Sequence, residues 1–280
     1  MAVFEVNFVS QCLNRAVPVH VILPTDKVYF PGMKQREEGK PYKTLYLLHG
    51  IIGNYTDWLY GTRIQRWAEE RDLAVVMPSG DNFSYLDQEW NGNYYGRFIG
   101  EELVSFMRKT FPLSHKREDT YIGGLSMGGF GAMRNGLKYS DTFGAIISLS
   151  PANLDLKEML QEPEHPAFFA QTLEYARSVL GQDLEAAVDS DKNPTWLIKR
   201  MIDEKRDIPP IYMACGDQDM LLLGCEAFSR LLTEHHVPHA FEIGPGSHEW
   251  DFWDTYIKKA LDWLPLEEKE AGMSSGNVGI

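Results

Sequence analysis

The residues best suited to covalent chemistry lie in the glycine-rich stretch Thr120-Tyr-Ile-Gly-Gly-Leu-Ser-Met-Gly-Gly-Phe-Gly131. An apolar run, which predicts a strand, leads directly into Ser126, and a helical pattern follows it. A serine on so sharp a turn exposes its hydroxyl, provided that small residues such as Gly124 and Gly128 let the strand and helix pass closely. We therefore predict that Ser126 is a nucleophile. The alternative is a glycine-rich turn that has no chemical role.

A serine nucleophile needs a base, which in this arrangement follows both the serine and an acid along the chain. Four later histidines suit this role less well, because they lie in an acidic, proline-rich segment, at the end of a helical pattern or at the start of a strand: His165, His235, His236 and His239. His248 lies in a glycine-rich loop after the last predicted strand. We expect His248 to be the base. The alternative is a residue at the start of the predicted helix Trp250 to Trp263.

Two carboxylates, Asp217 and Asp219, follow the apolar run at 211–214 and are candidates for the acid. A carboxylate at this place would accept the Nδ1–H of His248, fix its tautomer and stabilise the imidazolium of the transition state. Spacing alone does not choose between the two aspartates. We expect the other one to cap the loop.

The stretch Leu45-Tyr-Leu-Leu-His-Gly-Ile-Ile-Gly53 predicts a buried strand and the loop that follows it. In strand-turn-helix serine enzymes this loop supplies one backbone N–H to the developing oxyanion, and the residue after the serine supplies the other. We expect Ile51 and Met127 to be the two donors. We expect His49, at the strand end, to shape the loop.

The elements that must position these residues alternate along the chain. Apolar runs that predict strands lie at 45–48, 73–77, 121–123, 145–149 and 211–214, and helical patterns lie at 62–71, 97–111, 127–139 and 226–236. Two further runs, 3–10 and 17–23, predict an antiparallel hairpin that turns at Asn14 and Arg15. The pattern predicts a mostly parallel central sheet with helices on both faces.

One segment, 151–207, interrupts the alternation with acids, prolines and scattered aromatic residues. We expect a core at 1–150 and 208–269, a small cap inserted over the site at 151–207, and a flexible tail at 270–280. The aromatic residues that could line an acyl pocket are Trp196, Trp90, Tyr94 and Tyr95. The alternative for each is ordinary packing between cap and core.

Composition narrows the classes of partner. The chain of 280 residues has 27 Lys and Arg against 40 Asp and Glu, a formal net charge of -13, which repels nucleic acid and acidic lipid and favours a neutral substrate. We find no export signal and no apolar run long enough to span a bilayer, so we expect a soluble, cytoplasmic protein. The three cysteines lack zinc spacing and are expected to be reduced thiols, with no metal site.

These blocks together resemble the esterase D group of α/β-hydrolases, especially its bacterial tributyrin and feruloyl (cinnamoyl) esterase branch, over most of the chain. The matching blocks are Leu47-Leu48-His49-Gly50, Gly124-Leu125-Ser126-Met127-Gly128-Gly129, Cys215-Gly216 with Asp219, and Gly246 with His248-Glu249-Trp250. The resemblance implies the α/β-hydrolase fold, no metal or cofactor, and Asp219 as the acid. It also implies hydrolysis of short acyl, acetyl or hydroxycinnamoyl esters, with S-formylglutathione hydrolases as relatives.

The resulting hypothesis is a serine carboxylesterase that forms an acyl intermediate on Ser126. Its enzymatic alternatives are an S-formylglutathione hydrolase, an acetyl esterase and an acyltransferase, and its non-enzymatic alternative is a silent binding protein of the same fold. We expect a small ester as partner, no nucleic acid and no membrane, and consider a homodimer as the assembly.

Overall fold

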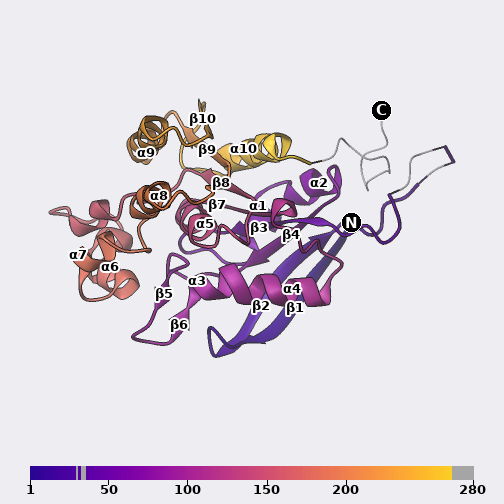
Figure 1. Ribbon diagram of the computed structural model, residues 1–280, viewed down its shortest axis with the longest axis horizontal. Coiled ribbons are helices and arrows are strands. Elements are labelled where there is room, and N and C mark those ends of the chain that lie inside the picture. The colour runs from indigo at the N-terminus through magenta and orange to yellow at the C-terminus, as the bar shows by residue number, and fades with distance from the viewer. Residues whose placement is uncertain (30, 33–35, 267–280) are drawn as a thin grey trace.

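A mostly parallel sheet of eight strands organises the computed structural model, which describes residues 1–29, 31–32 and 36–266 (Figure 1). The strand order is β1-β2-β4-β3-β7-β8-β9-β10. The strands are β1 (Ala2–Ser10), β2 (Arg15–Leu23), β3 (Lys43–Leu48), β4 (Leu73–Pro78), β7 (Thr120–Leu125), β8 (Ala145–Leu149), β9 (Ile211–Gly216) and β10 (His239–Gly244). A separate two-stranded ribbon consists of β5 (Asp87–Gln88) and β6 (Asn93–Tyr94).

The strand directions confirm the predicted architecture. β1 and β2 form an antiparallel hairpin in which Ser10 pairs with Arg15, and β2 is antiparallel to β4. All pairs from β4 to β10 are parallel. Because the carboxyl ends of parallel strands meet at one edge, the loops after β3, β7, β9 and β10 converge there.

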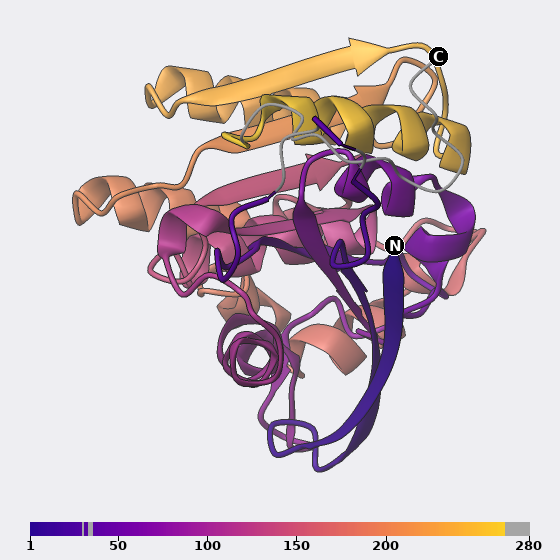
Figure 2. The same cartoon turned by 90° about the vertical axis from the view of Figure 1, so that its right-hand side faces the viewer.

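Helices cover both faces of the sheet (Figures 1 and 2). One face packs against α4 (Leu103–Thr110), α5 (Met127–Lys138), α8 (Pro194–Asp203) and α9 (Leu222–Glu234). The other packs against α1 (Asp57–Gly61), α2 (Ile64–Glu69) and α10 (Trp250–Trp263). The strands between are buried on both faces, which explains their continuous apolar sequences.

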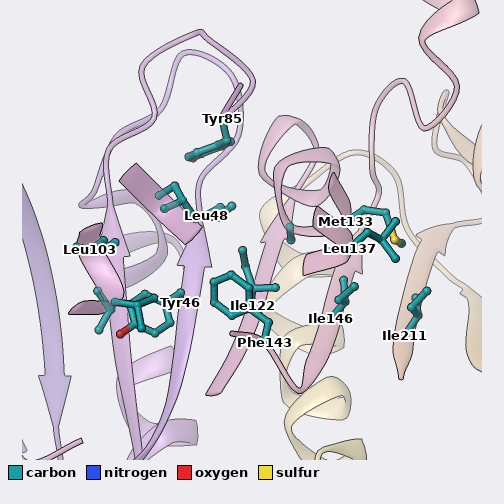
Figure 3. Close-up of a cluster of buried hydrophobic side chains, with 14 of the residues drawn as sticks. Tyr46, Leu48, Tyr85, Leu103, Ile122, Met133, Leu137, Phe143, Ile146 and Ile211 are labelled. Atoms are coloured by element: carbon teal, nitrogen blue, oxygen red, sulfur yellow. The ribbon is translucent and has the colours of Figure 1, made fainter. Parts of the chain in front are cut away.

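The larger core cluster lies between the strands and α5 (Figure 3). Ile122 and Ile146 extend from neighbouring strands on the side of Met133 and Leu137 of α5, whereas Tyr46 lies nearer Leu103 of α4, and all of these side chains are buried. This packing fixes α5 against β7, and therefore fixes the turn between them that carries Ser126.

Several predicted boundaries differ from the structure. The predicted helix 97–111 is a continuous helix made of α3 (Tyr95–Arg97), the π-helical turn η1 (Phe98–Glu102) and α4. The helix expected at 226–236 begins four residues earlier, at Leu222. The sequence does not mark this start, because no side chain caps the helix there. The helix expected at 62–71 is shorter and spans Ile64–Glu69 as α2.

The segment 151–207 contains short helices: η3 (Leu156–Leu160), η4 (Phe169–Gln171), α6 (Leu173–Leu180), α7 (Leu184–Val188) and α8. Apolar residues of η3, α6 and α7 form a cluster of their own with Leu86 and Phe130 of the core. In contrast, α8 packs directly on α5. The tail expected at 270–280 lies outside the described residues, and none of the described helices is long and apolar enough to cross a bilayer.

Candidate active site

Ser126 lies on a strained turn between β7 and α5. Its φ of 53° and ψ of -118° are rare for a residue with a side chain. The turn needs glycine on both sides, because a Cβ on Gly128 would lie 2.3 Å from the Leu48 carbonyl oxygen and one on Gly124 would lie 2.3 Å from the Gly128 carbonyl oxygen. The sequence Gly-x-Ser-x-Gly therefore produces the tight crossing that aims the hydroxyl out of the turn.

His248 joins Ser126 to Asp219 through hydrogen bonds at both ring nitrogens. Its Nε2 lies 3.0 Å from Ser126 Oγ, and its Nδ1 lies 3.0 Å from Asp219 Oδ2. A carboxylate can only accept at Nδ1, so Nδ1 carries the proton and Nε2 is free to accept the serine proton. The structure thus brings together the three side chains that the sequence analysis singled out.

Asp219 is held as a carboxylate. Burial of its side chain would raise its pKa, but hydrogen bonds from His248, the Leu221 amide and Ser150 outweigh burial, so the pKa lies below its ordinary value. The Leu221 N–H lies 2.9 Å from Asp219 Oδ1. A negative charge that stays ionised is what an imidazolium partner requires.

Asp217, the other candidate acid, is exposed and contacts the loop backbone instead of His248. Its Oδ1 accepts the Gly246 N–H at 3.3 Å, and its own N–H donates to the Gly244 carbonyl at 2.8 Å. Gly246 has a φ of 137°, so the loop before His248 turns where only glycine is unstrained. Asp217 therefore holds the shape of the histidine loop.

Sequence reasoning missed two further residues at the triad. Trp253 donates its Nε1–H to Ser150 Oγ at 3.2 Å, and its ring stands perpendicular to the His248 ring with centroids 4.9 Å apart. Ser150 in turn hydrogen-bonds Asp219. The available signal was positional, since Ser150 directly follows β8 and Trp253 lies in the first turn of the helix after His248.

The two expected oxyanion donors both line the cavity at Ser126. Throughout the described residues, neither the Ile51 nor the Met127 N–H donates to another protein group. Met127 is the first residue of α5, so its amide lies at the positive end of the helix dipole. Two unpaired amides beside a serine hydroxyl can stabilise an oxygen that becomes negative.

His49 shapes the loop after β3, as expected. Its Nδ1 lies 2.6 Å from the Gly50 carbonyl oxygen, and its Nε2 accepts the Gly80 N–H at 2.8 Å. Burial lowers its pKa, which favours the neutral ring that this pair of bonds requires. His49 therefore supports the loop from below and does not reach Ser126.

A cavity of about 860 Å³ opens onto the triad. Most of its lining is apolar or aromatic, including Leu86, Met127, Phe130, Leu156, Met159, Phe168, Tyr175, Val179, Trp250 and Trp253. The described lining residues include two acids, Asp57 and Glu249, but neither Lys nor Arg. The cavity is therefore suited to an uncharged or cationic molecule and poorly suited to an anion.

The aromatic residues expected in an acyl pocket lie elsewhere, and that expectation is wrong in this structure. Trp196 is on α8 and packs against the main core. Trp90 is 49% exposed beside Gly181, with the Lys192 ammonium 4.9 Å from its ring centre. Tyr94 is in β6 beside Arg97, and Tyr95 is buried. None belongs to the described cavity lining, to which η3 and α6 contribute Leu156, Met159, Tyr175 and Val179.

Within the described ranges, no group of three or more His, Cys, Asp or Glu side chains is arranged to hold a metal ion. The three cysteines are free thiols, with Cys215 and Cys225 buried.

The parallel sheet, the strained serine turn after β7 and the histidine loop after β10 define the α/β-hydrolase fold. Residues 10 to 264 match the model of the protein family described as "Putative esterase". The chain belongs to this family, which confirms its resemblance to the esterase D group. It is a serine hydrolase of carboxylic esters.

Known relatives cover nearly the whole chain. An acetyl esterase of Caldicellulosiruptor saccharolyticus is 42% identical over 94% of this chain and 98% of its own length. A fluorophosphonate-binding serine hydrolase of Staphylococcus aureus has a TM-score of 0.80 at 32% identity, covering 94% of this chain and 98% of that one. An S-formylglutathione hydrolase from the same organism has a TM-score of 0.78, with the same identity and coverage.

Proposed function

We propose that this esterase removes short acyl groups, acetyl foremost, from uncharged substrates through an acyl intermediate on Ser126. The observation that carries the proposal is the continuous hydrogen-bonded path from Ser126 through His248 to Asp219, beside the unpaired amides of Ile51 and Met127. These five groups fill the roles of nucleophile, base, orienting acid and oxyanion donors.

In the proposed cycle, Ser126 Oγ attacks the ester carbonyl as its proton moves to His248 Nε2. The carbonyl oxygen becomes negative and is stabilised by the Ile51 and Met127 amides. The carbon–oxygen bond to the alcohol then breaks, and His248 gives its proton to the leaving alkoxide. Water, deprotonated by the same imidazole, hydrolyses the acyl-serine and releases the acid.

The cavity supports an uncharged substrate. Its acidic residues Asp57 and Glu249 would repel the carboxylates of a glutathione thioester, and no basic residue of the described lining compensates. The volume of about 860 Å³ greatly exceeds an acetyl group, so the alcohol portion of the ester occupies most of the space. The 42% identical acetyl esterase supports the short acyl group.

Hydroxycinnamoyl esters are the second candidate, favoured by the aromatic lining. Phe130, Phe168 and Tyr175 could contact a cinnamoyl ring in place of the aromatic residues first expected. In both cases the segment 151–207 acts as a cap, because η3 and α6 line one side of the cavity. The cytoplasmic location and the homodimer stay predictions from the sequence.

A substrate panel tests the proposal. We expect hydrolysis of nitrophenyl acetate and butyrate, slower hydrolysis of methyl ferulate, and little turnover of S-formylglutathione. The Ser126→Ala variant should lose all of these activities, while the matched variant Ser105→Ala, at an exposed position on α4, should keep them. Faster turnover of S-formylglutathione than of every oxygen ester would overturn the proposed substrate class.

A further inference from the structure

The loop after β4 holds the loop that carries Ile51. Ile52 donates its N–H to Asn82 Oδ1 at 2.8 Å. Hydrogen bonds to the loop after β4 also hold both ends of the loop that carries Ile51. At the strand end, Tyr85 donates its hydroxyl to the His49 carbonyl at 3.0 Å, beside the Gly80 bond to His49 already described. At the far end, the Tyr55 N–H donates to Ser79 Oγ at 3.1 Å. The oxyanion loop therefore takes its shape from a neighbouring loop.

Ile52 needs such support because its backbone is strained. Its φ is 61°, a left-handed conformation in which a β-branched residue is a genuine outlier. Its side chain is 73% exposed, so core packing does not hold it there. The Gly53 N–H donates to the Gly50 carbonyl at 3.2 Å and closes the turn around Ile51 and Ile52, and the hydrogen bond to Asn82 is the side-chain interaction that opposes relaxation of the strain.

Asn82 is also connected to the helices of segment 151–207. Tyr175 of α6 donates its hydroxyl to the Asn82 carbonyl at 3.0 Å, and Ser84 Oγ lies 3.3 Å from the same hydroxyl. The Tyr175 ring lines the cavity and belongs to the apolar cluster against which the Ile51 side chain packs. The ring that would meet substrate is thus two hydrogen bonds away from the Ile52 amide.

We propose that Asn82 is a positioning residue that fixes the Ile51 amide in the oxyanion-binding orientation, and that Tyr175 couples this orientation to occupancy of the cavity. The inference rests on the proposed function, in which Ile51 is an oxyanion donor. Asn82 is not among the described lining residues, so it acts through the Ile51–Ile52 backbone and not by contact with substrate. Its side-chain oxygen holds the amide next to the donor, which restricts how the donor peptide can turn.

The proposal requires Asn82 to matter most in the transition state, when the oxyanion exists. Loss of a single oxyanion donor lowers kcat by about 100- to 1000-fold, and a donor that is displaced but present should cost less. For Asn82→Ala we expect kcat to fall about 10- to 100-fold with KM changed less than about 2-fold. The inhibition constant of a trifluoromethyl ketone, which forms a tetrahedral adduct with the serine, should rise by the factor by which kcat/KM falls.

Two further variants separate positioning from general damage. Replacing Ile52 with glycine removes the preference against positive φ, so the double variant Asn82→Ala with Ile52→Gly should recover part of the lost kcat. Tyr175→Phe keeps the ring in the cavity but removes the bond to Asn82, and should lower kcat about 3- to 10-fold without changing KM. Asn91→Ala, at an exposed position near β6, is the matched asparagine control.

The experiment is steady-state kinetics and ketone inhibition of all variants, with Ser126→Ala measured beside them. If Asn82→Ala matches wild type in kcat and ketone affinity, or changes KM alone, the positioning role is overturned while the triad proposal stands. If Ser126→Ala stays active, the proposed function itself fails. Should Asn82→Ala not fold, Tyr175→Phe decides, because an unchanged kcat in that variant would overturn the coupling.

Discussion

Trp253 donates its indole N–H to the Ser150 hydroxyl at 3.2 Å, and each residue also contacts a different member of the triad. The Trp253 ring stands at 90° to the His248 ring, and Ser150 hydrogen-bonds Asp219. The base and its orienting acid are therefore held by one connected pair of residues from β8 and α10. Neighbours of this kind fix the geometry that the reacting groups need.

Removal of the Ser150 hydroxyl should weaken catalysis without unfolding the protein. In Ser150→Ala, Asp219 loses one donor, so its pKa should rise, and kcat/KM should fall about 10-fold, equivalent to about 1.4 kcal/mol. Trp253→Phe keeps a ring against His248 and should have a smaller effect. The pH dependence of kcat/KM checks this, and wild-type values in Ser150→Ala would contradict it.

The two aspartates of the loop after β9 should differ sharply in a paired test. Asp219→Asn should reduce kcat by about 10⁴-fold, because an amide stabilises the wrong histidine tautomer. Asp217→Asn should cost less than about 10-fold, since Asp217 holds only the backbone of the loop. Activities of the two purified variants at one pH measure the difference, and a reversed order would move the acid to Asp217.

Two exposed aromatic residues offer a matched test of the cavity lining. Phe168 is 39% exposed and lines the cavity, whereas Trp90 is 49% exposed and does not. Phe168→Ala should change the ratio of feruloyl to acetyl turnover by a factor equivalent to about 1–3 kcal/mol, and Trp90→Ala should leave this ratio unchanged. Trp196→Ala should lower stability but keep the ratio, since Trp196 packs in the core. A changed ratio in Trp90→Ala would place the pocket elsewhere.

His49 should make folding stability depend on pH. Its pKa is lowered in the folded protein, mainly by burial, whereas the unfolded chain titrates near about 6.5. Below about pH 6.5 the unfolded state binds a proton that the folded state does not. The contribution of neutral His49 to the free energy of unfolding is therefore complete above about pH 6.5 and is lost as the pH falls toward the folded pKa. Thermal unfolding between pH 7.5 and 5.5 should therefore shift more in wild type than in His49→Gln. Equal shifts would contradict the neutral His49.

Much of this architecture could be predicted from the sequence, because its signals are local. Buried parallel strands produce unbroken apolar runs such as Leu73–Pro78, and the strained turn at Ser126 requires its two glycines. The local sequence does not tell which aromatic residues of segment 151–207 line the cavity. Trp196 packs against the main core and Phe168 lines the cavity, and no motif near either residue marks that difference. Ser150 acts on Asp219, which lies 69 residues away along the chain, and Asn82 acts on Ile52, which lies 30 residues away. No periodicity or motif reports contacts of that kind.

The central claim is that Ser126 becomes covalently acylated, and mass spectrometry of the trapped enzyme tests it most directly. Wild-type protein treated with a fluorophosphonate, or quenched in acid during turnover of nitrophenyl acetate, should gain the mass of one phosphonyl or acetyl group on the peptide containing Ser126. The Ser126→Ala variant should gain none, and Ser105→Ala should label like wild type. Labelling at another residue, or turnover with no modified Ser126, would contradict the account.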